Sequence, residues 1–235
     1  MLKDQLQYGT SSIDYTLEFA ERKTLGIKVH PDKSVHVIAP TDTTNEVIKS
    51  KVKSKASWIL KQQDFFLAFH PITPPRKFVS GESHLYLGKQ YRLKLIKASS
   101  EAVKLHGGNI EVYIKSVDNK EQITKLLRQW YKQKAEFHFN QLFEEKLPLT
   151  KSFYKGEAQL KYRWMKMRWG SCDKNGVVHL NLELIKAPKK CIEYVIVHEL
   201  CHLVHLDHSS AFYKLLEKLY PDWRTTKDKL EKLMV

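Results

Sequence analysis

The sequence predicts an α+β fold, with a β-rich N-terminal module that contains one helix (residues 1–118) and an α+β module over residues 119–235. Apolar and polar residues alternate with period two in several short segments of the first module, which is typical of strands. Helical spacing starts again at Lys120, and two more strand-like segments then precede the C-terminal helices. We see no internal repeat, so the change of pattern near residue 118 is the expected boundary.

The first module is expected to begin with an antiparallel pair of strands over residues 12–40, with a turn at Pro31-Asp32-Lys33. Helical spacing of apolar residues then predicts one helix over residues 41–69, ended by His70-Pro71. Residues 71–77 are rich in proline and are interpreted as a stiff connector. The other segments are short predicted strands around residues 78–80, 84–87, 91–97, 101–106 and 110–115.

The second module is expected to begin with a long helix from Lys120 to Lys146. Ala158–Trp169 and Val177–Leu184 are strand-like, and Asp173–Gly176 between them has the composition of a turn, so we expect a hairpin. A helix follows directly, and its buried stripe is predicted to consist of Ile192, Ile196, Leu200 and Leu203.

The strongest chemical signal lies in that helix, at His198-Glu199-Leu200-Cys201-His202. Residues four apart lie on one helical face, so His198 and His202 can direct two imidazole nitrogens at one point, with Glu199 beside them. Zinc suits such a site because it accepts neutral imidazole and, in catalytic centres, takes three protein ligands and leaves a fourth position for water. Glu199 would then take a proton from that water and pass it to the leaving group.

Two downstream histidines compete for the third ligand position. His205 stays near the ligand face if the helix continues, because it lies three residues beyond His202. His208 reaches the same point if the helix ends before it and a second amphipathic helix starts near Ser209. The apolar spacing after Ser209 favours the second arrangement. His205 would then either contact a ligand residue without binding the metal itself or face the substrate.

Arg168 and Trp169 are the candidate substrate-binding residues, since they end the strand-like segment that leads to the site. Arg168 could stabilise a developing negative charge or hold a phosphate, and Trp169 could stack on a ring. Pairing of Arg168 with a carboxylate and packing of Trp169 against the core explain the two residues equally well.

Several segments resemble the YgjP-like metal-dependent hydrolases: MRWGSC at 167–172, HLNLELIKAP at 179–188, VIVHELCHLVHLDHSSAFY at 195–213, YPDW at 220–223 and, in the first module, GESHLYLGKQYRLKL at 81–95. The chain is more distantly similar to SprT-like and zincin metallopeptidases, although nothing matches the cysteine zinc ribbon of many SprT-like proteins. The resemblance implies a zincin-like second module, with zinc held by His198, His202 and His208 and with Glu199 as the catalytic carboxylate.

Three functional classes follow from these observations. The leading class is a zinc-dependent, metallopeptidase-like hydrolase that acts on a peptide or protein. The YgjP-like resemblance also suggests a nucleoside triphosphate pyrophosphohydrolase with UTP as a substrate, although the chain has no Walker-type glycine loop. The SprT-like resemblance and the net charge of +14 together suggest a nucleic-acid-associated protease or scaffold that binds through its basic surface.

Composition and termini predict a folded protein of the cytoplasm. The chain has 42% hydrophobic residues to fill a core, no run of 18 apolar residues and no signal-peptide pattern at MLKDQLQYG. The three cysteines are Cys172, Cys191 and Cys201, an odd number at irregular spacing, which argues against a disulfide framework. The lysines are dispersed along the chain, so the charge fits a solvated surface as well as a binding face.

Overall fold

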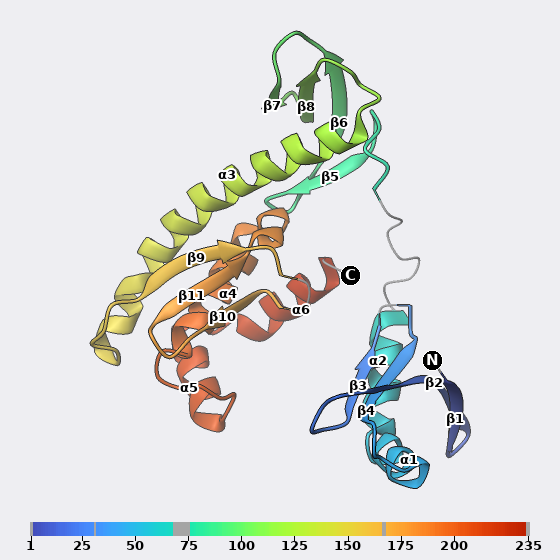
Figure 1. Cartoon of the computed structure of the whole chain (residues 1–235). Helices are drawn as coiled ribbons and strands as arrows, with labels where there is room; N and C mark the ends of the chain where they lie inside the picture. The colour runs from blue at the N-terminus through green and yellow to red at the C-terminus, as the bar shows by residue number, and fades with distance from the viewer. Residues whose placement is uncertain (1, 31, 68–75, 166–167, 234–235) are drawn as a thin grey trace. The chain divides into compact units, whose positions relative to one another are not determined.

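The computed structural model describes residues 2–30, 32–67, 76–165 and 168–233, and it confirms the α+β fold. The chain divides into two compact units, Met1–Pro74 and Pro75–Met234 (Figure 1). This division comes earlier than the predicted boundary near residue 118, which falls inside the second unit, between a sheet and the helix that follows it. Most of the expected connector at 71–77 lies outside the described residues.

The first unit is a four-stranded sheet followed by two helices: β1 (Leu2–Tyr8), β2 (Ser11–Ala20), β3 (Gly26–Val29), β4 (Val35–Pro40), α1 (Asn45–Ser54) and α2 (Ala56–Leu67). Alternate residues of the central strands point into a core, which explains their period-two pattern. The buried residues of this unit are Ile13, Tyr15, Leu17, Val35, Val37, Ala39, Ile48, Val52, Ala56 and Ile59.

Three details of this unit differ from the sequence-based expectation. The expected antiparallel pairing holds for β3 with β4, whereas β2 pairs with β4 in parallel. The edge strand β1 was not expected at all, because its residues are mostly exposed and lack an apolar alternation. The single helix expected over 41–69 is interrupted at Lys55, which has φ −105° and ψ 3°. Pro31, in the expected turn, lies outside the described residues.

The second unit begins with another four-stranded sheet and a long helix: β5 (Ser83–Tyr86), β6 (Lys89–Lys97), β7 (Ala102–His106), β8 (Asn109–Ile114) and α3 (Lys120–Lys146). These elements were predicted within a few residues, except that residues 78–80 form no strand. Asn119 caps α3, since its side chain accepts a hydrogen bond from the backbone N–H of Gln122 at 3.0 Å.

The rest of the second unit consists of a three-stranded sheet with its helices: η1 (Leu147–Ser152), β9 (Gln159–Arg163), β10 (Gly170–Cys172), β11 (Val177–Asn181), η2 (Leu182–Lys186), α4 (Lys189–Cys201), α5 (Ser210–Leu219) and α6 (Trp223–Leu233). The strand expected over Ala158–Trp169 ends at Arg163, so Arg168 and Trp169 lie in the connection before β10. The hairpin is therefore formed by β10 and β11, while β9 pairs with β11 in parallel.

The two four-stranded sheets share one topology, which is an internal repeat that the sequence analysis missed. Their strand orders are β1-β2-β4-β3 and β5-β6-β8-β7, each with one parallel pair flanked by antiparallel pairs. From the last strand into the following helix, buried residues recur at a constant separation in numbering: Val35 and Ile110, Val37 and Val112, Ala39 and Ile114, Ile48 and Ile123, Val52 and Leu127.

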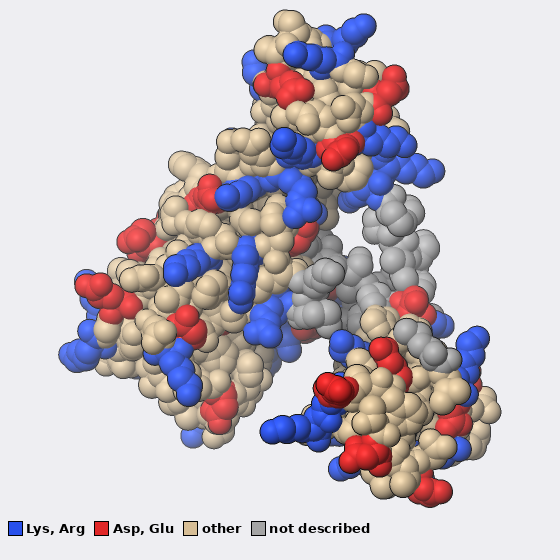
Figure 2. Space-filling model, in the orientation of Figure 1, with Lys and Arg blue, Asp and Glu red and all other residues tan. Residues whose placement is uncertain are grey.

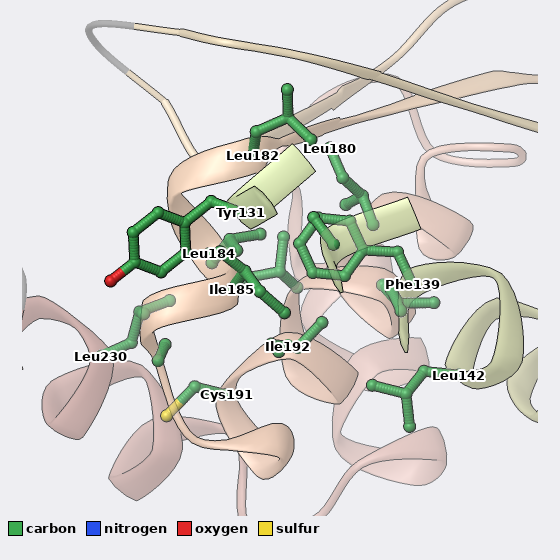
Figure 3. Close-up of a cluster of buried hydrophobic side chains, with 14 of the residues drawn as sticks. Tyr131, Phe139, Leu142, Leu180, Leu182, Leu184, Ile185, Cys191, Ile192 and Leu230 are labelled. Atoms are coloured by element: carbon green, nitrogen blue, oxygen red, sulfur yellow. The ribbon is translucent and has the colours of Figure 1, made fainter. Parts of the chain in front are cut away.

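The main core of the second unit lies where α3 packs against α4, η2 and β9. Figure 3 shows Tyr131, Phe139 and Leu142 of α3 in one cluster with residues of β11, η2, α4 and α6, namely Leu180, Leu182, Leu184, Ile185, Cys191, Ile192 and Leu230. This packing fixes α4, the helix that carries the candidate site. No helix among the described residues is both long and apolar enough to span a bilayer.

Candidate metal centre

His198 and His202 are positioned by α4 and by the first residue beyond it. One flank of α4 is fully buried, and Ile192, Ile196 and Leu200 anchor it in the core as the apolar spacing predicts. His202 is the C-cap residue and keeps helical dihedrals (φ −70°, ψ −11°), so the four-residue register with His198 is preserved. The centroids of the two imidazole rings are 5.1 Å apart.

His208 joins them because the chain reverses direction after α4. The α-helix ends at Cys201, and Ser209 caps α5 by accepting a hydrogen bond from the backbone N–H of Phe212. His208 therefore sits at the corner between the two helices, and its Nε2 atom lies 3.0 Å from Nε2 of His198. One nitrogen from each of the three histidines falls within 4.8 Å of the others. The imidazole of His205 is not part of this group.

The ring of Phe212 packs against all three imidazoles. Its side chain is fully buried, and its ring centroid lies 4.9 Å from that of His198, 4.6 Å from that of His202 and 4.8 Å from that of His208. These contacts restrict the rotamers of the histidines without supplying a polar partner. Phe212 is the first residue of the apolar spacing after Ser209, and its position four residues after His208 was the signal that it also faces the histidines.

His205 acts through its backbone. Its carbonyl oxygen lies 2.7 Å from Nδ1 of His202. A carbonyl only accepts hydrogen bonds, so Nδ1 of His202 carries the proton and Nε2 keeps its lone pair. In many metal-binding proteins, such a hydrogen bond to one ring nitrogen keeps the other nitrogen unprotonated and able to bind the metal. Nδ1 of His198 is buried and has no hydrogen-bond partner among the described residues.

One nitrogen separation and the charge states of two of the histidines fit a bound zinc ion. Zinc binds imidazole nitrogens at about 2.0–2.1 Å, so two such nitrogens in a tetrahedral site lie about 3.3 Å apart. The 3.0 Å separation of the His198 and His208 nitrogens is close to this value. Burial lowers the pKa of His198 to about 3, with further contributions from His202 and His208, and burial also lowers the pKa of His202. Both residues are therefore neutral at pH 7, which is the form that binds a metal.

Glu199 lies beside this cluster and does not join it. Its side chain is 5% exposed, and its Oε2 atom has no hydrogen-bond partner among the described residues. Burial raises the pKa of Glu199 to about 8, while the positive charge of Arg168 acts in the opposite direction. A buried carboxyl group whose pKa lies near neutrality, next to three convergent imidazoles, is suited to exchanging a proton with a reacting group.

An open cavity of about 470 Å³ gives access to these groups. Arg168 and Trp169 both line it, Arg168 exposed and Trp169 half-buried, so the structure brings the two candidate substrate-binding residues to the same cavity as His198 and Glu199. The remaining wall comes from β10 on one side and from the α4 end on the other: Gly170, Ser171, Cys172, Tyr194, Val195, His202, Leu206 and His208.

Asn181 holds the connection that carries Arg168. Its side-chain Nδ2 donates hydrogen bonds to the carbonyl oxygens of Met165 and Arg168, each at 2.9 Å, and its Oδ1 accepts from the backbone N–H of Met165 at 3.2 Å. The same Oδ1 caps η2 by accepting from the N–H of Glu183 at 3.1 Å. Asn181 is 3% exposed, so these bonds are shielded from water. The sequence analysis did not single it out, because these partners are only brought together by the fold.

Three convergent histidines with an adjacent buried carboxylate define a candidate centre of a metal-dependent hydrolase. The model of one protein family, the YgjP-like metallopeptidase domain, matches residues 23–233, and the chain belongs to this family. The resemblance inferred from the sequence is thus confirmed, and a metallopeptidase-like hydrolase activity with a catalytic metal follows from the family.

The crystal structure of the metallopeptidase zymogen of Pyrococcus abyssi abylysin is similar to part of the chain, with 23% identity and a TM-score of 0.37. The match covers 41% of this chain and 94% of abylysin. A search of curated proteins finds no match.

Proposed function

We propose that this protein is a zinc-dependent peptidase in which His198, His202 and His208 hold the ion and Glu199 is the general base. The observation that carries the proposal is the convergence of the three histidines within 4.8 Å beside a buried carboxylate. Three imidazole ligands are a common donor set of catalytic zinc. The metallopeptidase description of the family supports a peptide as the substrate.

Different residues of the site bind the metal ion and transfer the proton. A bound zinc ion would supply a Lewis acid and would lower the pKa of water in its coordination sphere. Ionised Glu199, a form that Arg168 and a bound cation would both favour, receives the proton of the attacking water and returns it to the leaving amine, a role worth about 10²–10⁴-fold in rate. Arg168, exposed in the same cavity, offers a positive charge to the oxygen that becomes negative during the reaction.

Strand β10 offers a place for the substrate backbone. It is an edge strand of its sheet, and Gly170, Ser171 and Cys172 all line the metal cavity. An extended peptide can pair with such an edge through backbone hydrogen bonds, which bring its carbonyl groups toward the adjacent helix. The half-buried ring of Trp169 beside β10 would then cover an apolar side chain of the peptide.

A parallel assay of zinc-loaded protein on a peptide library and on a panel of nucleoside triphosphates that includes UTP tests this proposal. We expect cleavage of peptides and a loss of about 10²–10⁴-fold in Glu199→Gln, which removes the base and keeps every ligand. Hydrolysis of UTP with no peptide cleavage would contradict the proposal in favour of the pyrophosphohydrolase. Nucleotide and nucleic-acid partners have no support from the family description or from the solved structure.

A further inference from the structure

The second unit contains another cavity, of about 450 Å³, with a different lining from the metal cavity. Its walls come from the start of the unit, from α3, from the residues after β9 and from η2. Three of its residues are cationic and three are aromatic: Arg76, Arg128, Lys186, Phe78, Tyr131 and Trp164. This combination of a polar charged lining and apolar walls is typical of a specific binding cavity.

Two of the three cations have no anionic partner among the described residues. Lys186 forms an ion pair with Glu183, the acidic residue of the lining, and its ammonium lies 5.6 Å from the centre of the Tyr131 ring. Neither Arg76 nor Arg128 forms an ion pair with any Asp or Glu in the described part of the chain. Two guanidinium groups in one cavity therefore present unneutralised, fork-shaped donors that match a carboxylate.

The walls hold these donors in place. The guanidinium of Arg128 lies over the ring of Trp164, 4.8 Å from its centroid, which orients the group by stacking. Arg76 donates a hydrogen bond to the backbone carbonyl of Ser83. His84 also lies in the wall, and burial lowers its pKa; the charges of Arg76 and Lys186 act in the same direction and Glu82, 3.2 Å away, in the opposite one. The cavity thus favours one negative group with an apolar neighbour.

One segment of the chain joins this cavity to the metal cavity. Trp164 and Met165 line the first, while Arg168 and Trp169 line the second. The carbonyl oxygens of Met165 and Arg168 are both 2.9 Å from Nδ2 of Asn181, so they can be no farther apart than twice that distance. The linings of the two cavities therefore approach each other at this segment.

We propose that this second cavity, here called the arginine cavity, binds an acidic side chain of the peptide substrate, with Arg76 and Arg128 holding its carboxylate. The inference rests on the proposed peptidase function and adds a substrate class to it: peptides with Asp or Glu a few residues from the scissile bond. The surface charge agrees with this class, because residues 75–235 contain 30 Lys and Arg against 18 Asp and Glu. Figure 2 shows Lys and Arg side chains prominent around the N-terminal half of α3, which carries Arg128.

Peptide binding to zinc-loaded Glu199→Gln protein, followed by fluorescence anisotropy, tests the inference without turnover. The probes are a labelled neutral octapeptide and its forms in which each position in turn carries Glu or Gln. We expect Glu to bind about tenfold more tightly than Gln at one position or at two adjacent ones. Adding Arg128→Gln should abolish this preference. Lys125→Gln, which removes an exposed charge of the same helix outside the cavity, should preserve it.

Other results would overturn the inference. A Glu preference of equal size at every position, or one that falls equally in the Arg128→Gln and Lys125→Gln proteins, would report only the net charge of the unit. Equal binding of the Glu and Gln forms, or no peptide binding, would equally exclude an acidic subsite. Cleavage by the wild-type protein is measured separately, so failure of the peptidase proposal is seen as absent cleavage and is distinct from any anisotropy result.

Discussion

A Cβ atom on Gly170 would lie 2.6 Å from Oε1 of Glu199 and 2.7 Å from its Cγ. The edge strand β10 is thus in contact with the helix α4 at this point. The side chain of Glu199 occupies the space that a side chain on residue 170 would need. No larger residue fits at 170 unless the buried Glu199 moves.

Gly170→Ala should therefore reduce hydrolysis by up to the ~10²–10⁴-fold contribution of the general base, because it displaces Glu199 while leaving the three histidines in place. The zinc dissociation constant should remain close to the wild-type value. Steady-state rates and a competitive chelator titration measure the two quantities. Lys174→Ala, in the exposed turn after β10 and outside the cavity lining, is the control, and unchanged hydrolysis in Gly170→Ala would show that Glu199 is free to move.

The histidine cluster should bind about one zinc per chain, and the combined His198→Ala and His202→Ala substitutions should abolish binding because two of three ligands are lost. Elemental analysis of purified protein measures the metal content. A double variant of two exposed histidines, His30→Ala and His106→Ala, should keep its zinc. Retention of zinc by the first double variant would refute the assignment of the site.

His208→Ala should weaken zinc binding far more than His205→Ala. The first substitution removes a ring nitrogen that lies 3.0 Å from His198, whereas the second keeps the backbone carbonyl that contacts His202. His205→Ala should weaken zinc binding by less than the ~10–100-fold typical of substituting a residue that hydrogen-bonds to a metal ligand. Chelator competition at fixed pH gives both dissociation constants. The reverse order would mean that α4 continues in solution and presents His205 instead.

Asn181→Asp should lower the free energy of unfolding by about 2–4 kcal/mol, since it removes the two hydrogen bonds donated by Nδ2 and places a charge in a buried site. Because these bonds hold the segment before Arg168, KM should rise while the zinc dissociation constant changes little. Denaturant unfolding and steady-state kinetics give these values. Asn175→Asp, in an exposed turn, should have neither effect; an unaltered KM in Asn181→Asp would exclude a positioning role.

The two units should respond separately to mutation and to zinc. Val37→Ala and Val112→Ala truncate fully buried residues at matching places in the two sheets, so each should cost about 1–3 kcal/mol in its own unit. Added zinc should raise the free energy of unfolding of only one unit, the one that contains Val112, because a ligand stabilises only the fold that binds it. Denaturant titration of the full chain with and without zinc checks this; an equal zinc effect on both transitions would contradict it.

Local patterns in the sequence were sufficient to predict the elements closest to the site. The spacing of His198 and His202, the cap at Ser209 and the stripe that begins at Phe212 all depend on residues within a few positions of each other. The start of α5 therefore followed from local rules, and with it the corner that carries His208, whereas α4 ends at Cys201, so Leu203 of the predicted buried stripe lies beyond the helix. Gly170 and Asn181 could not be found in this way, because their roles depend on partners brought near by packing.

Strand pairing and unit boundaries were less accessible to sequence reasoning. Period-two alternation shows that β2 and β4 are strands, but it does not show that they run parallel. Strand β1 lies at an edge and buries little, so it lacks the alternation that reveals other strands. The boundary near residue 118 was placed where strands give way to a helix, and the repeated topology explains why: the same change occurs at the end of β4 and again at the end of β8.

The presence of two sheets with the same strand order also creates a hazard during folding. A strand emerging from one copy meets two acceptors of the same direction and similar length, so exchange of strands between copies, or between neighbouring molecules, competes with correct assembly. Differences in the connections oppose this exchange: β7 and β8 are joined by Gly107 and Gly108, both at positive φ, whereas β3 and β4 are joined by a longer loop without glycine. Short local connections favour pairing of each hairpin within its own unit over pairing with strands of the other copy.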